Sequence, residues 1–335
     1  MLNGKSVFEY KAYVSPSGGP LPSGQEFFRY RFAESREELE KTAESRESFP
    51  FGDSLLDFLY YDAAGNAGLF QSVAADIKLL KESQDEGLVD AIRAKLEQIS
   101  GLHIYFQLLK FDWYCRLDRR HATRDINALL PHDELANLPA AIAQRQKIAF
   151  ALISEVLAFD GKDGSIQEKM KGYCLPKAGR EIPPYPFTPL LTRFSLMDNA
   201  VFVPVLDRAM SIFDLLTYFL QLSVEREQVY KQCKSCGRYF ALSGYSTTEY
   251  CAREYGSTGR TCREIGASVA FQRKVESEPA IAAYQKAYKK KFAHIRYKKI
   301  TKDEFSAWSE IARDKRDRCV AGELPLDEFK DWLNQ

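Results

Sequence analysis

Four cysteines lie close together in the C-terminal third of this 335-residue chain. Cys233 and Cys236 are separated by two residues, Cys251 follows after fourteen more, and Cys262 after a further ten. Two intervening residues let both sulfurs of the first pair reach one ion from a tight turn, and Gly237 can adopt the left-handed conformation that closes it. Zinc prefers four soft ligands in a tetrahedron, which leaves no position for water or substrate. The spacing therefore predicts a structural Zn²⁺ site.

The other cysteines favour a metal over disulfides. Cys115, Cys174 and Cys319 stand alone, and the first ten residues lack the apolar stretch of a secretory signal. We therefore expect a cytoplasmic protein, in which thiols stay reduced. We expect no membrane span, because no apolar run approaches the roughly 18 to 20 residues required. The gap before Cys262 is long for a zinc site, so His294 or Cys319 is an alternative fourth ligand.

A family resemblance follows from the cysteine segment. The run from Cys233 to Phe240, with Tyr250–Cys251 and Arg260–Arg263, resembles the zinc knuckle of CGNR-type and related treble-clef fingers of bacterial regulators. Together with the tail through Trp308 and Trp332, it also resembles an uncharacterised family of clostridial-type bacteria and their mobile elements. The resemblance implies a DNA-binding or regulatory protein of a bacterium or mobile element. This chain departs from the CGNR pattern, which keeps its third and fourth cysteines three residues apart and follows the fourth with Gly-Asn-Arg.

Basic residues are concentrated after the first two-thirds of the chain. From residue 231 onward there are 21 Lys and Arg against 14 Asp and Glu, although the net charge of the whole chain is only +1. Residues 284–299 include seven basic residues and no acidic one. A clustered basic surface is typical of contact with nucleic-acid phosphates. The residues that we predict to make this contact are Arg238, Arg253, Arg260, Arg263, Lys286, Lys289, Lys290 and Arg296.

A helix is predicted to carry the central part of this basic surface. Ser277 can cap the helix, and Pro279 in its first turn leaves no amide unpaired. On a helical wheel one face is apolar and the opposite face carries the lysines. The apolar face consists of Ile281, Tyr284, Tyr288, Phe292 and Ile295. A second helix should start at Thr301, whose hydroxyl can form a capping box with Glu304.

The first two-thirds of the chain has mostly helical periodicity. A helical stretch is predicted from Leu88 to about Leu117, with a break at Gly101. Leu88, Ile92, Leu96 and Ile99 recur at three- and four-residue spacing. Four strands are predicted as two hairpins: residues 8–14 with 27–32, and 191–197 with 200–206 around Asp198 and Asn199. The five prolines of residues 175–189 exclude regular structure there and indicate a long connection or an internal boundary.

These patterns predict a mainly α protein of the α+β class. Residues 1–228 should form a helical body with short β-hairpins. Residues 229–335 should form the zinc knuckle, the basic helix and a helical tail. A knuckle this small cannot bury enough apolar surface to fold alone, so its metal should supply much of its folding free energy.

Two functions are compatible with this organisation. The first is a zinc-finger protein that binds nucleic acid, with DNA favoured, through its basic third. The second is a protein-interaction or scaffold module, whose basic helix docks on an acidic protein partner. A metal-dependent hydrolase is a less favoured third hypothesis. It would use His121, Asp125, His132 and Asp133, which fit no catalytic motif, so we assign no catalytic residues and expect no enzyme activity.

Overall fold

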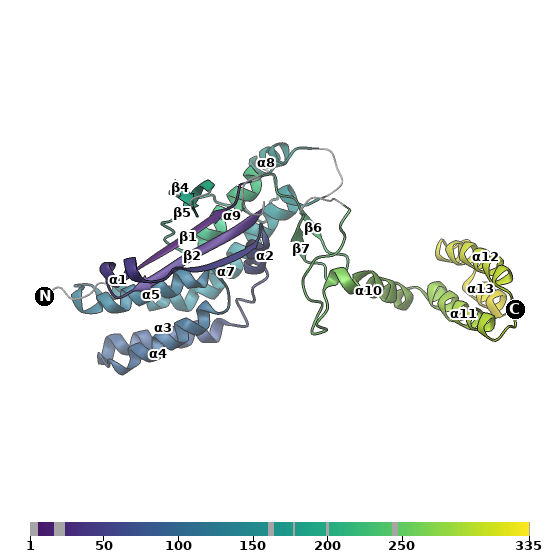
Figure 1. Ribbon diagram of the computed structural model, residues 1–335, viewed down its shortest axis with the longest axis horizontal. Coiled ribbons are helices and arrows are strands. Elements are labelled where there is room, and N and C mark those ends of the chain that lie inside the picture. The colour runs from purple at the N-terminus through teal and green to yellow at the C-terminus, as the bar shows by residue number, and fades with distance from the viewer. Residues whose placement is uncertain are drawn as a thin grey trace. The chain divides into compact units, whose positions relative to one another are not determined.

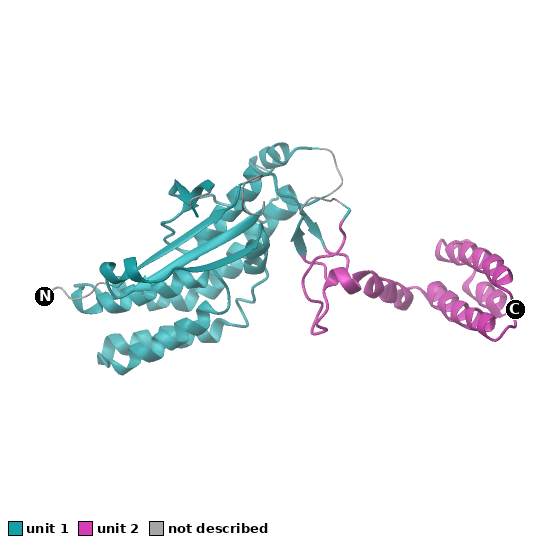
Figure 2. Ribbon diagram, viewed as in Figure 1, with its two compact units in different colours: residues 1–232, 239–247 teal, residues 233–238, 248–335 magenta. Residues whose placement is uncertain are grey.

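The structure of the chain is a computed structural model that describes residues 6–16, 24–159, 164–176, 178–198, 201–242 and 247–334. Helix accounts for 57% of the chain and strand for 14%, which confirms the predicted mainly helical α+β class. Among the helices that the structure describes, none is long and apolar enough to cross a membrane. The chain divides into two compact units (Figure 2). Unit 1 comprises residues 1–232 and 239–247, and unit 2 comprises residues 233–238 and 248–335.

Unit 1 is built on a five-stranded antiparallel sheet with the strand order β3-β2-β1-β5-β4 (Figure 1). Its strands are β1 (Val7–Val14), β2 (Gln25–Ala33), β3 (Ser45–Pro50), β4 (Thr192–Met197) and β5 (Val201–Leu206). Both predicted hairpins are present, although Asn199 of the second turn lies outside the described residues. The sequence did not predict that the two hairpins join. Ala12 of β1 pairs with Leu206 of β5, so segments far apart in the chain complete one sheet.

One face of the β1–β2 hairpin forms the main core with the helices of unit 1. Tyr10, Ala12 and Phe28 are buried on this face, as expected from the two-residue period of a strand. The helices are α1 (Arg36–Lys41), α2 (Asp53–Leu59), α3 (Ala67–Ser83), α4 (Gly87–Ser100), α5 (Phe106–Arg119), α6 (Ile126–Leu129), α7 (His132–Leu152), α8 (Ile166–Cys174) and α9 (Ile212–Glu225). A short 3₁₀ turn (Arg120–Ala122) follows α5, and a π-helical turn (Ile153–Leu157) extends α7. The break between α4 and α5 confirms the prediction at Gly101.

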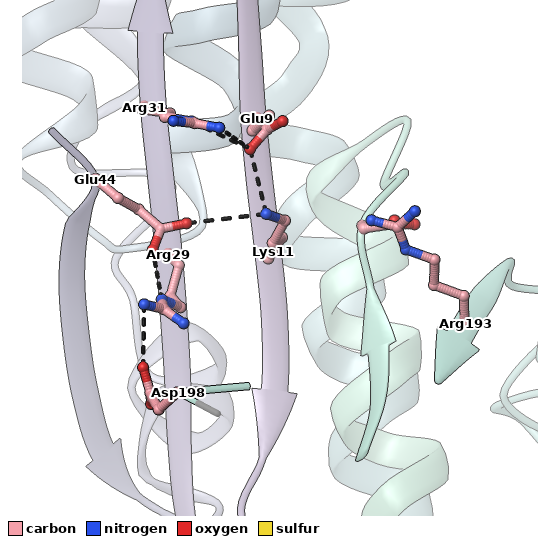
Figure 3. Close-up of polar contacts among 8 residues, drawn as sticks. Glu9, Lys11, Arg29, Arg31, Glu44, Arg193 and Asp198 are labelled. Carbon is pink, nitrogen blue, oxygen red and sulfur yellow. Dashed lines mark hydrogen bonds and ion pairs between the residues drawn. The ribbon is translucent and has the colours of Figure 1, made fainter. Parts of the chain in front are cut away.

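The opposite face of the same hairpin carries a chain of ion pairs (Figure 3). The Glu9 carboxylate forms an ion pair with Arg31, with an oxygen–nitrogen distance of 3.0 Å. The Glu44 carboxylate forms one with Arg29 at 2.6 Å. Arg29 also donates to Asp198, at the turn between β4 and β5, at 3.2 Å. These side chains are only partly buried, so each pair contributes little to stability by itself. The pair between Arg29 and Asp198 connects the β4–β5 turn to β2.

The described residues of the proline-rich stretch, 175–176 and 178–189, form an irregular connection between α8 and β4, within unit 1. Tyr185 is buried there, and its hydroxyl lies 3.0 Å from that of Thr217 in α9. The connection is therefore packed against the body of unit 1.

Unit 2 contains the helices α10 (Cys262–Ser277), α11 (Pro279–Arg296), α12 (Lys302–Val320) and α13 (Leu326–Asn334). We call the part of the chain from Cys233 to the end of α10 the cysteine segment. The sequence did not predict α10. Because Ser277 is the last residue of α10, the N-cap of α11 is Glu278, and the predicted Ser277 cap is wrong. The predicted capping box between Thr301 and Glu304 is confirmed.

The helices α11, α12 and α13 share a small core of their own. Its buried members are Ala280, Ala312, Leu324, Phe329 and Leu333. Only the first half of α11 takes part, through Ala280, Ala283, Tyr284 and Ala287. Phe292, which the helical wheel placed on the apolar face, is 57% exposed. The apolar face of α11 is therefore not covered along its whole length.

Glu26 of β2 is a fully buried carboxyl group in unit 1. It accepts hydrogen bonds from the backbone N–H groups of Gly52 at 2.7 Å and Ser54 at 3.2 Å, at the start of α2. Burial raises the pKa of Glu26 to about 8, because the surrounding core disfavours a charged carboxylate. Glu26 thus joins β2 to α2 mainly as a neutral acid at pH 7.

The raised pKa of Glu26 predicts a pH-dependent stability. The unfolded chain releases this proton near the ordinary pKa, whereas the native state keeps it until about pH 8. The native state therefore binds more protons in between, and the free energy of unfolding should fall by up to about 1.4 kcal/mol per pH unit as the pH rises. Glu26→Gln should flatten this dependence between pH 5.5 and 8 in urea titrations. The matched control Glu40→Gln, at an exposed position on α1, should keep it, and parallel curves for all three proteins would contradict the prediction.

Candidate metal centre

The first two cysteines lie in the turn of a short hairpin. Strands β6 (Tyr230–Gln232) and β7 (Tyr239–Ala241) pair, and the residues between them carry Cys233 and Cys236. The backbone N–H of Cys233 donates to the carbonyl of Arg238 at 2.9 Å, and that of Gly237 donates to the carbonyl of Cys233 at 2.8 Å. Gly237 has a φ of 73°, which confirms the predicted left-handed residue. This backbone pattern turns both thiols to the same side.

The second two cysteines are brought together by a closed loop. A β-bridge pairs Glu254 with Thr261, and the Cys262 N–H donates to the carbonyl of Arg253 at 2.8 Å. The long gap between Cys251 and Cys262 is therefore a returning loop. Cys262 is the first residue of α10, whose cap is the box between Thr261 and Glu264.

The four sulfur atoms form one compact group. The Sγ atoms of Cys233, Cys236, Cys251 and Cys262 all lie within 4.8 Å of one another, and those of Cys236 and Cys251 are 3.7 Å apart. A disulfide would need about 2.05 Å. Zinc–sulfur bonds of about 2.3 Å place the corners of a tetrahedron about 3.8 Å apart, so this geometry suits a four-coordinate metal. Neither of the alternative fourth ligands, His294 and Cys319, belongs to the group.

The electrostatics of the group favour a bound cation. Burial opposes ionisation of Cys233, but backbone N–H groups, including that of Cys251 at 3.4 Å from its sulfur, lower its pKa to about 7. Burial raises the pKa of both Cys251 and Cys262. Four adjacent thiols cannot all lose their protons without a cation to offset the charge. The group is thus suited to a metal that takes thiolates.

Two contacts from α10 support the cysteine segment, and sequence reasoning missed both. The Arg273 guanidinium donates to the carbonyl of Ser235 at 2.8 Å and to the hydroxyl of Tyr255 at 3.0 Å. Gly266 packs directly on Tyr250, since a Cβ at this position would lie 2.2 Å from the ring. A glycine inside a helix is costly unless close packing needs it, so Gly266 was a usable signal. The sequence carried no such signal for Arg273, because its hydrogen-bond partners are distant in sequence.

The basic residues predicted to contact nucleic acid all belong to unit 2. Arg253 is partly buried, whereas the other seven are exposed. The exposed ones are Arg238, Arg260, Arg263, Lys286, Lys289, Lys290 and Arg296. Among the described residues, none makes an ion pair with the last four of these, which lie on α11. Their charge is therefore available to solvent or to a partner.

Of the four residues in the hydrolase hypothesis, the sequence neighbours His132 and Asp133 form a pair, with His132 Nε2 3.6 Å from Asp133 Oδ1, whereas His121 and Asp125 are engaged elsewhere. His121 pairs with Glu86 at 3.2 Å, Asp125 caps α6, and the ring of His132 lies 2.9 Å from the Lys81 ammonium. Within the described part of the chain, the cysteine group is the arrangement of His, Cys, Asp and Glu that could hold a metal.

Comparison with known proteins links this region to a family. A model described as a family of unknown function (DUF6076) matches residues 207–329, from just before α9 into α13. The match includes all four cysteines and covers little more than a third of the chain. It supports neither the CGNR-type nor the clostridial resemblance. No curated protein and no solved structure matches the chain.

The cysteine geometry predicts one divalent metal per chain. Protein loaded with Co²⁺ should show the intense thiolate-to-cobalt absorption of a tetrahedral all-sulfur site, because all four ligands are cysteines. Serine substitution at Cys236 or Cys262 should reduce this absorption and lower metal affinity at least tenfold. Cys174→Ser and Cys319→Ser, outside the group, should leave both unchanged. An unaltered spectrum after Cys262→Ser would show that another residue supplies the fourth ligand.

Proposed function

We propose that the four cysteines hold one structural Zn²⁺ and that unit 2 is a zinc-stabilised module. The observation that carries this proposal is the approach of all four sulfurs to within 4.8 Å of one another. Four thiolates around a divalent ion fill its tetrahedron, so the ion would have no position for a substrate. The order of knuckle, returning loop and helix bearing the last ligand is also typical of treble-clef fingers. Zinc would join the β6–β7 turn to the start of α10.

Zinc removal should unfold the cysteine segment selectively. Among the described residues of 233–277, the buried apolar ones are Cys233, Phe240, Cys251 and Cys262. The metal must therefore replace a hydrophobic core there. On chelation, hydrogen exchange should speed up across 233–277, while α3 and α9 keep their protection. The same chelator should leave exchange of an apo Cys236→Ser protein unchanged, and uniform loss of protection along the wild-type chain would contradict two separately stable units.

The function that the surface of unit 2 supports best is nucleic-acid binding, with DNA favoured. Lys286, Lys289, Lys290 and Arg296 form what we call the α11 basic surface, and all four are exposed. Ala280 and Ile281 on the same helix are buried, so the helix is anchored by one side and charged on the other. A row of cations on a helix, none in an ion pair with a described residue, is suited to contact phosphates by releasing condensed counterions. The zinc centre would be structural, and the α11 basic surface would make the contact.

Charge reversal on this surface tests the proposal. Lys286→Glu combined with Lys290→Glu should weaken binding to duplex DNA at least tenfold. The slope of log affinity on log salt should become shallower by about 2, since each lost phosphate contact removes about 0.9. Fluorescence anisotropy at several salt concentrations would measure both effects.

The matched control is Lys78→Glu with Lys171→Glu, which makes the same charge change at exposed helical positions of unit 1. It should leave the slope unchanged, and thermal melting should show that both double variants fold. Equal affinity of the α11 variant and wild type, or no salt-dependent binding at all, would instead favour the acidic protein partner.

A further inference from the structure

A groove of about 640 Å³ lies beside the second half of α11, between this helix and the start of α12. Its floor is apolar and includes Phe292, Ile295 and Phe305, whereas cationic side chains from Lys289, Arg296 and Lys302 line it as well. No acidic residue contributes to the lining. This volume is in the usual range of sites that hold a small organic group.

The ring of Phe292 is held firmly and yet remains open to solvent. It is parallel to Tyr288 at a centroid distance of 6.3 Å and packs edge-on against Phe305 at 5.5 Å. Phe305 is buried, whereas Phe292 is 57% exposed. Neighbouring rings therefore fix its orientation, and a large part of its surface is free for a flat apolar ligand group.

The charged residues of the groove require that the same ligand be anionic. Lys289, Arg296 and Lys302 are exposed, and no carboxylate of the described residues forms an ion pair with them. The nearby carboxylate of Glu304 is occupied, since it accepts from the N–H and hydroxyl of Thr301 at 2.7 and 3.0 Å. A ligand that suits this groove has a flat apolar group between negative charges.

We propose that this groove binds single-stranded nucleic acid, with one base stacked on Phe292 and neighbouring phosphates on Lys289, Arg296 and Lys302. This inference rests on the proposed nucleic-acid function and specifies the substrate. A duplex keeps its bases inside and presents phosphates and sugars, so it has nothing to place on the apolar floor. An unpaired strand offers both chemistries at once, and every base has a face that can stack. The groove thus selects the unpaired form of nucleic acid.

The test compares an oligo-dT strand with a hairpin duplex of equal length, both labelled with fluorescein, on the full-length protein. Phe292→Ala should weaken oligo-dT binding about tenfold, as expected for the loss of one stacked base, and change duplex binding less than twofold. Oligo-U in place of oligo-dT would distinguish RNA from DNA as the source of the strand. The control is Ile311→Ala, which removes a 51% exposed side chain from α12 outside the groove.

A second variant keeps the test independent of any loss of folding. Phe292→Trp retains a stacking ring, so oligo-dT should bind it with near wild-type affinity and quench the added tryptophan emission, whereas the duplex should not. The wild-type protein, with its three tryptophans, supplies the background.

The outcomes separate this inference from the proposed function. Salt-dependent binding of both nucleic acids that Phe292→Ala leaves unchanged, or weakens equally, would overturn the stacking site and keep nucleic-acid binding. No binding of either nucleic acid by the wild-type protein would overturn both. Binding of an acidic amphipathic peptide alone, with sensitivity to Phe292→Ala, would also overturn both and would assign the groove to a protein partner.

Discussion

The main physical constraint on unit 2 is the repulsion that its four adjacent, buried or half-buried cysteines would experience as thiolates. They lie within 4.8 Å of one another, and burial opposes the loss of protons by Cys251 and Cys262. A cation at the centre converts this repulsion into attraction and makes deprotonation favourable. The backbone is already arranged for that purpose, since amide donors stabilise the Cys233 thiolate. Because α10 begins at Cys262, a metal bound to this group would hold the start of that helix.

The two units are stabilised in different ways. Unit 1 has an extensive core in which one face of a five-stranded sheet packs on several helices. In unit 2, the α11–α13 bundle has a small core and the cysteine segment has almost none. A segment with so little buried apolar surface cannot offset its chain entropy without a cross-link or a metal. Arg273 and the contact of Gly266 with Tyr250 add packing, but they act only once the segment is ordered.

The proposed functional surface also follows from the small size of the apolar core in unit 2. In the described part of the chain, the buried cluster of the bundle uses the first half of α11. Phe292 in the second half stays exposed beside Lys289 and Arg296, which form no ion pair with a described residue. The zinc centre, the α11 basic surface and the groove would then have separate roles: the first orders the module, the second attracts phosphates, and the third selects unpaired bases.

The sequence by itself determined the features that depend on neighbours along the chain. The turn of Cys233 and Cys236, the left-handed Gly237, the break at Gly101 and the two hairpins all follow from local spacing and backbone preference. The amphipathic character of α11 was also readable, because helical periodicity needs no tertiary information.

Only the tertiary structure decided the features that join distant segments. Three features involve residues far apart in sequence, so no local pattern encodes them. These are the pairing of Ala12 with Leu206, the hydrogen bonds of buried Glu26 to the start of α2, and the hydrogen bond from Arg273 to Ser235. The spacing left the fourth cysteine of the group open, and the closed loop that returns to Cys262 resolved it. The exposure of Phe292 was likewise hidden, because a helical wheel shows which face is apolar but not how far along the helix a neighbour covers it.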